Sequence, residues 1–462
     1  MSAVREQQDA MMGPDSVPEV PRPLVAGTAQ RAIAFDVGGD VAQQRFLDQV
    51  RGVAAQLPQA AHAINLCEDR YRFLVALCAA ALRGQVTLLP PSRAAAVVEE
   101  VRQAHPDSYC IRDGDACDTA GSVADAWRLP DPLPELSGEM PVVEDAALAV
   151  IGFTSGSTGK PSANPKTWGG FRTSTTQNLA ALRDLWPADA VAHIVATVPP
   201  QHMYGMELSV LMPLFADAAV HGGRPFFPHD VAEALSHAQA HRLLVTTPVH
   251  LRALVQSGVS LPPLAGIVSA TAPLSRELAA EAEARFGCEV RELFGSTETC
   301  VIARRRTAVD SAWTPLPGVV VEPQPDGALV RARHLPAPVR LADLVSVDAQ
   351  GHFELRGRNA DLLEIAGKRA SLGDLTRRLQ GIPGVEDGVV FQLDDDVRGV
   401  RRVAALVVAP GLDEAHILAA LRAVVDPVFL PRPLRCVEHL PRNETGKLPR
   451  DALLALLRGN MR

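Results

Sequence analysis

Residues 146–161 read AALAVIGFTSGSTGKP. The first half is a continuous apolar run of strand length, and it leads directly into a loop of Gly, Ser and Thr. Glycines free the backbone of such a loop, and its hydroxyl groups donate hydrogen bonds to phosphate oxygens. The loop from Thr154 to Lys160 therefore predicts a site for the phosphates of a nucleotide.

The other common phosphate-binding pattern, G-x-x-x-x-G-K-[ST], does not fit this loop. It requires Gly where this sequence has Thr154, and Ser or Thr where it has Pro161. Taken alone, the loop could also be an ordinary Gly- and Ser-rich surface segment. Its interpretation therefore depends on the rest of the chain.

Alternating strand and helix patterns surround the loop. Short apolar runs predict strands, and periodic segments that begin near a capping residue or end at Gly predict helices. The expected strands are 86–89, 146–153, 191–198, 243–247 and 267–269, and the expected helices are 66–84, 230–241 capped by Asp230, and 275–286 ended by Gly287. This alternation predicts an α/β fold with mostly parallel sheets covered by helices on both faces.

The pattern changes after Gly357-Arg358, which predicts a second domain. Strands are expected near 389–393 and 402–408, and a helix at about 413–425. We therefore predict that residues 1–357 form a large N-terminal domain of mostly parallel sheets flanked by helices. Residues 358–462 are expected to form a small, mobile α+β C-terminal domain.

Composition narrows the functional class. The 462 residues carry a formal net charge of −8, which argues against a nucleic-acid-binding surface across the whole molecule. The seven cysteines are dispersed without a C-x-x-C pair, so we expect reduced thiols and no structural zinc. Residues 1–23 lack the pattern of a secretory signal, and no apolar run reaches the roughly eighteen residues of a membrane span. A cytoplasmic protein without membrane insertion is the expectation.

Three further motifs follow the phosphate loop along the chain. Residues 292–299 read ELFGSTET after another predicted strand, residues 341–344 read LADL, and residues 441–447 read PRNETGK. Together and in this order, the four motifs resemble the adenylate-forming superfamily, which holds acyl-CoA synthetases, the adenylation domains of nonribosomal peptide synthetases and firefly luciferase. The resemblance spans about residues 66–454. It implies that superfamily's fold, ATP and Mg²⁺ as cofactors, and AMP-forming activation of a carboxylic acid before its transfer to a thiol.

The resemblance implies that residues from all four motifs contact the nucleotide. It implies a phosphate cradle of Thr154, Ser155, Gly156, Ser157, Thr158, Gly159 and Lys160, and further nucleotide contacts from Phe294, Gly295, Ser296, Thr297, Asp343 and Arg358. Thr297 would lie near the AMP phosphate, and Glu298 would bind the magnesium of ATP, for which a carboxylate is a suitable hard ligand. Asp343 would accept hydrogen bonds from both ribose hydroxyls because its carboxylate offers two acceptor oxygens. Lys447, beside the permissive Gly446, would stabilise the charge that develops during adenylation.

Two other segments are implied to hold the acid. His202, Tyr204 and Gly205 match a segment in which a His or aromatic residue gates the acyl pocket, so His202 joins Thr297, Glu298 and Lys447 as an expected catalytic residue. Ser269, Ala270, Thr271 and Ala272 match a segment of small residues that lets adenine and the acyl group lie close to the backbone. Thr271 stands where the superfamily has a smaller residue and is expected to narrow the pocket. His202 could instead be a satisfied core histidine.

Some residues depart from the superfamily pattern. Its members have Lys and Gly directly after the loop's proline, whereas Ser162–Pro165 come first here and Lys166 is left as a possible substitute for that lysine. The hinge position two residues after Arg358, usually Asp or Lys, is Ala360, with Asp361 next to it. His237 and His241 would share one face of a surface helix, but they lack the glutamate and third ligand of a zinc site.

The extended segment that ends in Lys166-Thr167-Trp168-Gly169 is similar to ligases of aryl-polyene and xanthomonadin-like pigment pathways in bacteria. That resemblance implies a hydroxybenzoate-type aromatic acid as substrate and the phosphopantetheine thiol of an acyl carrier protein as acceptor. A stand-alone acyl-CoA or aryl-CoA synthetase shares every motif and stays an alternative. A non-catalytic acyl-adenylate or nucleotide-binding protein is a further alternative, against which the joint retention of the acidic and basic motif residues argues.

Overall fold

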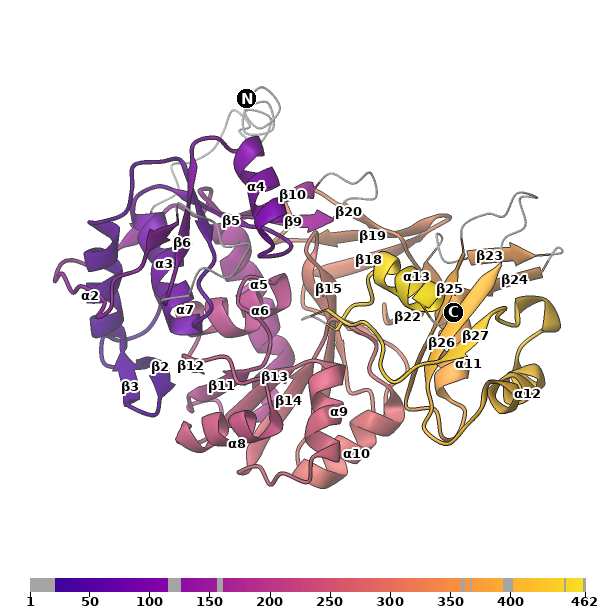
Figure 1. The fold of residues 1–462 in the computed structure, drawn as a ribbon. Coiled ribbons are helices and arrows are strands. Elements are labelled where there is room, and N and C mark those ends of the chain that lie inside the picture. Colours follow the sequence, from indigo (N-terminus) through magenta and orange to yellow (C-terminus); the bar gives the residue numbers. More distant parts are fainter. Residues whose placement is uncertain are drawn as a thin grey trace. The chain divides into compact units, whose positions relative to one another are not determined.

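The computed structural model describes residues 21–114, 126–155, 161–358, 362–365, 368–393, 402–443 and 446–459. The chain divides into two compact units (Figure 1). Unit 1 extends to Val319 and includes Arg331–Ala337, whereas unit 2 consists of Val320–Val330 and the chain from Pro338 onward. The division between the two units thus begins after Val319, which is earlier in the sequence than the predicted boundary at 357/358. A mobile hinge at that boundary stays a prediction.

A nine-stranded sheet forms the framework of unit 1, in the order β17-β16-β15-β14-β13-β11-β12-β2-β3. Its strands are β2 (Ala32–Asp36), β3 (Gly39–Ala42), β11 (Ala192–Ala196), β12 (Ala218–His221), β13 (Arg242–Thr246), β14 (Leu264–Ser269), β15 (Val290–Ser296), β16 (Cys300–Arg305) and β17 (Thr314–Pro315). Neighbouring strands run parallel from β2 across to β15, and antiparallel strands close both edges. The predicted strands and mostly parallel sheet are confirmed. Their carboxyl ends share one edge, where such sheets bind ligands.

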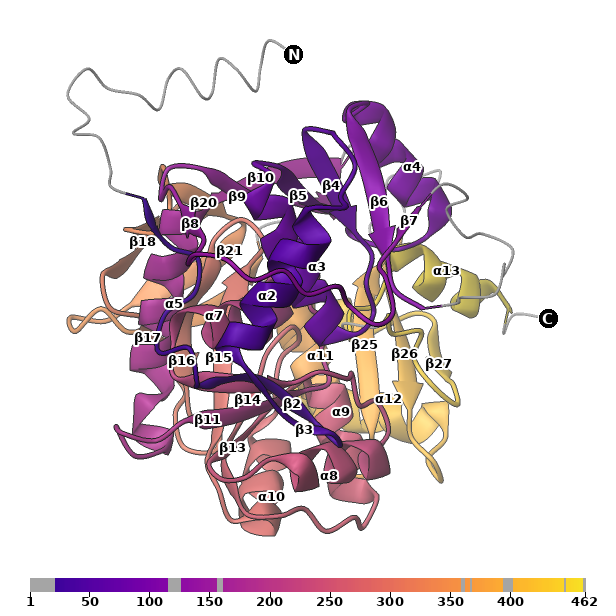
Figure 2. The same ribbon diagram turned by 90° about the vertical axis from the view of Figure 1, so that its left-hand side faces the viewer.

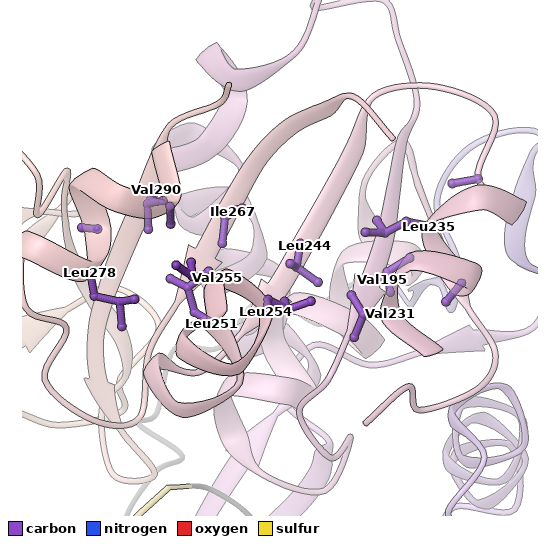
Figure 3. Packing of buried hydrophobic residues seen from close by; sticks show 14 of the residues in the cluster. Val195, Val231, Leu235, Leu244, Leu251, Leu254, Val255, Ile267, Leu278 and Val290 are labelled. Atoms are coloured by element: carbon purple, nitrogen blue, oxygen red, sulfur yellow. The ribbon is translucent and has the colours of Figure 1, made fainter. Parts of the chain in front are cut away.

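Helices α8 (Pro228–His237), α9 (Pro248–Gln256) and α10 (Arg276–Phe286) cover one face of this sheet. Figure 3 shows how Val231, Leu251, Leu254 and Leu278 from the helices pack around Leu244 and other strand residues. The predicted ends of α10 are confirmed, because the Ser275 hydroxyl accepts from Leu278 N and Gly287 ends the helix at a φ of 66°.

Two details predicted for α8 are wrong. Phe227 is its N-cap, and Asp230 lies in the first turn, where the carboxylate accepts a hydrogen bond from Phe227 N at 3.1 Å. The helix ends at His237, so His241 lies outside it. His237 instead stacks on His221, with ring centroids 5.7 Å apart.

A six-stranded sheet in the order β10-β9-β5-β4-β6-β7 carries the phosphate loop. Its strands are β4 (His62–Asn65), β5 (Val86–Leu89), β6 (Ser108–Arg112), β7 (Trp127–Arg128), β9 (Leu148–Ser155) and β10 (Pro161–Thr167). Helix α3 (Arg70–Leu82) is apolar around most of its surface because it packs between this sheet and β12 of the larger one (Figure 2). β10 pairs antiparallel with β9, Pro161 opposite Ser155, so residues 156–160 join two strands of one hairpin.

The described part of unit 2 is built from small, mostly antiparallel sheets, with β26 and β27 pairing parallel, and from α-helices. Strands β18 (Val319–Gln324), β19 (Gly327–Ala332) and β20 (Val339–Leu341) form one sheet, and β21 (Asp343–Val347) pairs with β22 (Phe353–Arg358). β23 (Leu362–Ile365) pairs with β24 (Lys368–Ser371), and β25 (Asp387–Gln392), β26 (Val403–Val408) and β27 (Leu434–Cys436) form the last sheet. One face of that last sheet packs against α11 (Leu372–Gln380) and α12 (Glu414–Val424), and the other packs against α13 (Arg450–Gly459). The α+β pattern predicted for this part of the chain is confirmed.

Among the described residues, no helix has the length and apolar character that crossing a membrane requires.

Candidate active site

The strand that precedes the phosphate loop lies directly against the second motif. A Cβ atom at Gly152 of β9 would stand 3.1 Å from Thr297 Cγ2 and 3.4 Å from Met203 Cε. A side chain at this position would therefore press on the Thr297 methyl group and would also contact Met203. The motifs near residues 154, 202 and 297 therefore meet in unit 1, although they are far apart in the sequence.

Thr154 and Glu298 form a direct contact between two of the predicted nucleotide motifs. The Thr154 hydroxyl donates to Glu298 Oε1 over 3.3 Å, and both side chains are only partly buried. Gly156, Ser157, Thr158, Gly159 and Lys160 lie outside the described residues, and of Ser155 only the backbone is described. The contact places a hydroxyl and a carboxylate at the start of the loop, which are the hard oxygen ligands that Mg²⁺ prefers.

Thr297 and Glu298 lie in the tight turn of the β15–β16 hairpin. A Cβ at Gly295 would stand 2.2 Å from Cys300 O, so the two strands approach too closely there for any other residue. Cys300 has a φ of 59°, in the left-handed region that non-glycine residues seldom adopt. Ser296 and Thr299 close the turn by exchanging backbone-to-hydroxyl hydrogen bonds of 3.1 and 3.2 Å. Phe294 packs at the edge of this hairpin against Trp313, with ring centroids 5.3 Å apart.

Three buried ionisable residues surround the turn, and sequence reasoning missed two of them. Lys166 of β10, singled out only as a possible substitute, donates from Nζ to Glu298 O over 2.6 Å. Glu207 and His334 were not predicted, and they bond to Val301 N and Thr299 O at 2.9 and 2.7 Å. Burial raises the pKa of Glu207 and lowers the pKa of His334. No motif marks these two residues in the sequence: Glu207 lies in a mostly apolar segment, and His334 follows Arg331 and Arg333 in a segment without a recognised pattern.

The predicted acid-binding segments lie at the carboxyl edge of the larger sheet. Tyr204, in the short helix α6 (Met203–Met206), donates to Val268 O at 2.9 Å, and burial raises the pKa of its hydroxyl. A Cβ at Gly205 would stand 2.0 Å from Pro199 O, so α6 can pack here only with glycine at that position. His202 is the N-cap residue of α6, neither fully buried nor fully exposed. Its gating role stays a prediction.

The second acid-binding segment continues from β14. The Ser269 side chain is fully buried, and its Oγ has no hydrogen-bond partner within the described part of the chain. Ala270 is buried, and Thr271 has a φ of 81°, which turns the chain sharply before Ala272. An unpaired buried hydroxyl next to a strained turn is typical of a ligand-binding position.

In unit 2, the third motif and the predicted boundary arginine lie opposite each other. Asp343 opens β21 and Arg358 closes β22, and the two are partners in the antiparallel pairing. The side chain of Arg358 is outside the description, as are Ala360 and Asp361. The register brings together two residues that the resemblance assigns to the same nucleotide, and their contacts with ribose stay a prediction.

The loop that carries Lys447 is anchored by side chains that the motif alone does not explain. Asn443 accepts a hydrogen bond from Lys447 N at 2.9 Å, and Gly446 has a φ of 77°, which glycine adopts readily. Arg442 donates to Gly446 O at 2.7 Å and forms a two-pronged ion pair with Asp387 of β25 at 2.8 and 3.0 Å. The Lys447 side chain itself is exposed. Its side chain is therefore exposed next to backbone groups that Arg442 and Asn443 hold by hydrogen bonds.

Comparison with known proteins agrees with this geometry. A family model for AMP-binding enzymes matches residues 53–330, and one for the AMP-binding enzyme C-terminal domain matches residues 378–447. The 4-coumarate–CoA ligase of Rhodobacter capsulatus is 31% identical over 294 residues, which cover 64% of this chain and 73% of that protein.

Solved structures share the fold over nearly the whole chain. ATP-bound MatB from Rhodopseudomonas palustris has a TM-score of 0.77 at 19% identity, covering 94% of this chain and 97% of that one. The o-succinylbenzoate–CoA synthetase (MenE) of Bacillus subtilis in complex with its acyl-adenylate has a TM-score of 0.79 at 17% identity, covering 94% and 98%. The chain belongs to the AMP-binding enzyme family and is an ATP-dependent, AMP-forming acid–thiol ligase that uses ATP with Mg²⁺.

Proposed function

We propose that this ligase activates a hydroxybenzoate-type aromatic acid and transfers it to the phosphopantetheine thiol of an acyl carrier protein. The observation that carries the site assignment is the Thr154–Glu298 contact, because it joins two nucleotide motifs in one place. Aromatic substrates are supported by the matched relatives, which include 4-coumarate–CoA and indoleacetate–CoA ligases. The segment from Lys166 to Gly169 adds the resemblance to pigment-pathway ligases.

In the first half-reaction, the carboxylate of the acid attacks the α-phosphorus of ATP and pyrophosphate leaves. We propose that the Thr154 loop and Thr297 hold the phosphates, and that Glu298 binds the metal. Bound with ATP, magnesium neutralises charge on the phosphate oxygens. Asp343 would bind the ribose hydroxyls, and Lys447 would stabilise the charge that grows at the α-phosphate.

In the second half-reaction, a thiolate attacks the carbonyl carbon of the mixed anhydride, and AMP leaves. The proposed carboxyl-edge pocket, from His202 to Gly205 and from Ser269 to Ala272, would hold the acyl group for both steps. Thr271 supports a short, flat acid, because its threonine side chain stands on a left-handed backbone where the superfamily has a smaller residue.

Pyrophosphate exchange across a panel of acids tests the substrate class. We expect hydroxylated benzoates or cinnamates to support exchange more strongly than saturated fatty acids, because a narrowed pocket excludes a long flexible chain. Acetate and C12 to C16 acids serve as controls on the same enzyme preparation. Stronger exchange with a C12 to C16 acid would reject the aromatic proposal and leave the ligase activity itself intact.

The acceptor is tested by competition between a holo acyl carrier protein and free CoA. We expect the carrier protein to give more thioester at equal concentration, because carrier proteins are acidic and unit 2 offers arginines for electrostatic contact. Arg402 and Arg432, together with Arg458, line a cavity of about 390 Å³ with an apolar floor. Among the other basic residues of this part of the sequence, Arg435 pairs with Glu414 at 2.9 Å, which reduces its availability. Arg398 and Arg401 lie outside the described residues.

Reversing the charge of Arg432 tests whether the cavity that Arg402, Arg432 and Arg458 line binds the carrier protein. Arg432→Glu should raise the KM for the carrier protein, while Arg422→Glu on the exposed side of α12 should leave it unchanged. Equal yields from CoA and carrier protein, with no effect of Arg432→Glu, would favour the stand-alone CoA synthetase.

A further inference from the structure

We propose that Lys166, Glu207 and His334 are positioning residues that fix the Thr297–Glu298 turn in the shape that binds ATP-bound magnesium. The inference rests on the proposed role of Glu298 as the metal-binding carboxylate. It concerns how that carboxylate is held, which is independent of the identity of the acid and of the thiol.

The three side chains form hydrogen bonds with backbone groups of residues 298, 299 and 301. Lys166 Nζ donates to the carbonyl of residue 298 at 2.6 Å, and His334 Nε2 donates to the carbonyl of residue 299 at 2.7 Å. Glu207 Oε2 accepts from the amide of Val301 at 2.9 Å. They come from β10, from the segment 331–337 and from the π-helical turn Glu207–Leu211, so three distant parts of unit 1 converge on one hairpin turn.

Glu207 is itself held in place by a second set of contacts. Ser174 and Asn178, one turn apart on α5 (Trp168–Leu182), both donate to its Oε1, the Asn178 bond measuring 2.9 Å. With Val301 on the other oxygen, both carboxylate oxygens are bonded, and the side chain is 1% exposed. Glu207 therefore acts as a fixed acceptor within the protein and is not available to a substrate.

The turn needs this support because its backbone is strained. Cys300 adopts a left-handed φ, and Gly295 lies too close to the opposite strand to carry a side chain. A buried carbonyl that loses its donor costs the free energy of its desolvation, so the peptide rotates to find another partner. Rotation of the peptide that follows residue 298 would swing the Glu298 carboxylate away from Thr154.

The atom to which Lys166 bonds indicates that it positions Glu298 and does not itself bind the metal or ATP. Lys166 bonds to the backbone carbonyl of Glu298, whereas the Glu298 carboxylate bonds to Thr154. A lysine on the carboxylate would compete with a cation for its oxygens. On the carbonyl, the lysine fixes the residue and leaves the carboxylate oxygens available to a metal.

Calorimetric binding of ATP tests the proposal without turnover. Lys166→Met removes the ammonium group and keeps an unbranched apolar side chain that matches the lysine up to Cε. We expect it to weaken the binding of ATP in Mg²⁺ by about 10- to 100-fold, the usual cost of losing a residue that orients a metal ligand. Binding of AMP, and of ATP in EDTA, should weaken by a clearly smaller factor, because without the metal both depend on this turn through Thr297 and not through the Glu298 carboxylate.

Gln177→Leu is the matched control. Gln177 is a buried neighbour of Asn178 on α5, and its side chain donates to Pro317 O at 2.8 Å, away from the turn. This variant loses a comparable buried hydrogen bond and should bind ATP in Mg²⁺ like the wild type. If Lys166→Met also does so, or if it loses AMP binding to the same extent, the positioning role is wrong.

His334 offers a second test should Lys166→Met fail to fold. His334→Gln keeps an N–H donor at the position of Nε2, whereas His334→Leu removes it. We expect the Gln variant to retain Mg²⁺-dependent ATP binding and the Leu variant to lose about 10-fold or more. Equal binding by the two variants would overturn the proposal. The acid panel and the competition between carrier protein and CoA both use the wild-type enzyme. A failure of the positioning proposal, seen in the Lys166 and His334 variants, can therefore be distinguished from a failure of the proposed function.

Discussion

Replacing Lys447 by Ala is expected to lower the rate of acyl-adenylate formation by ~10²–10³, or about 3–4 kcal/mol, and to leave the transfer step largely intact. The loss would follow from the proposed role of Lys447 as the cation placed where charge grows on the α-phosphate. The transfer step involves no reaction at that phosphate group except its departure as AMP. Pyrophosphate exchange measures the first step, and thioester formation from chemically prepared acyl-adenylate measures the second.

Arg422→Ala is the control for the loss of a positive charge elsewhere in unit 2, since Arg422 is exposed on α12. It should affect neither step. If Lys447→Ala slows both steps equally in a folded protein, the lysine does not serve adenylation alone, and its proposed role in the first half-reaction only is wrong.

The second large effect is expected at Glu298. Glu298→Gln keeps the size of the side chain and the contact with Thr154 but removes the charge that favours a divalent cation. We expect adenylation to fall by about 10²-fold at low millimolar Mg²⁺ and to recover in part as the Mg²⁺ concentration is raised. A titration of exchange activity against Mg²⁺ measures both the loss and the recovery.

Glu289→Gln provides the comparison for this experiment. Glu289 precedes the same strand and pairs with Arg291 and Arg306, so the variant loses a carboxylate without touching the turn. Its Mg²⁺ dependence should match that of the wild type. A Glu298→Gln curve that is lower at every Mg²⁺ concentration, with an unchanged midpoint, would mean that the carboxylate does not bind the metal.

Much of the fold was predictable because its strands are buried on both faces. The run 146–153 is apolar throughout, and 243–247 opens with Leu243, Leu244 and Val245, which is how a central parallel strand differs from its surroundings. Strand β10 was not predicted, because Ser162, Asn164 and Pro165 are poor strand formers. β10 lies at the edge of its sheet and pairs only with β9. A proline, which has no backbone N–H, is tolerated in such an edge strand.

The site was predictable only where function imposes a local motif. Thr154 and Glu298 stand in such motifs, and the structure brings them together. Glu207 and His334 carry no local signal, since they matter through contacts with residues that are dozens of positions away. The same holds for Asp387, which supports the Lys447 loop from another strand.

The ion pair between Arg442 and Asp387 offers a way to follow the position of Lys447 with a label placed elsewhere in unit 2. Because Arg442 also donates to Gly446 O, it links the backbone next to Lys447 to strand β25. A fluorophore or spin label on the exposed side of α12, which packs on that same sheet, would therefore travel with the lysine without perturbing it. Distances from such a label to a second label in unit 1 would test, in real time, the predicted mobility of the part of the chain that carries the lysine.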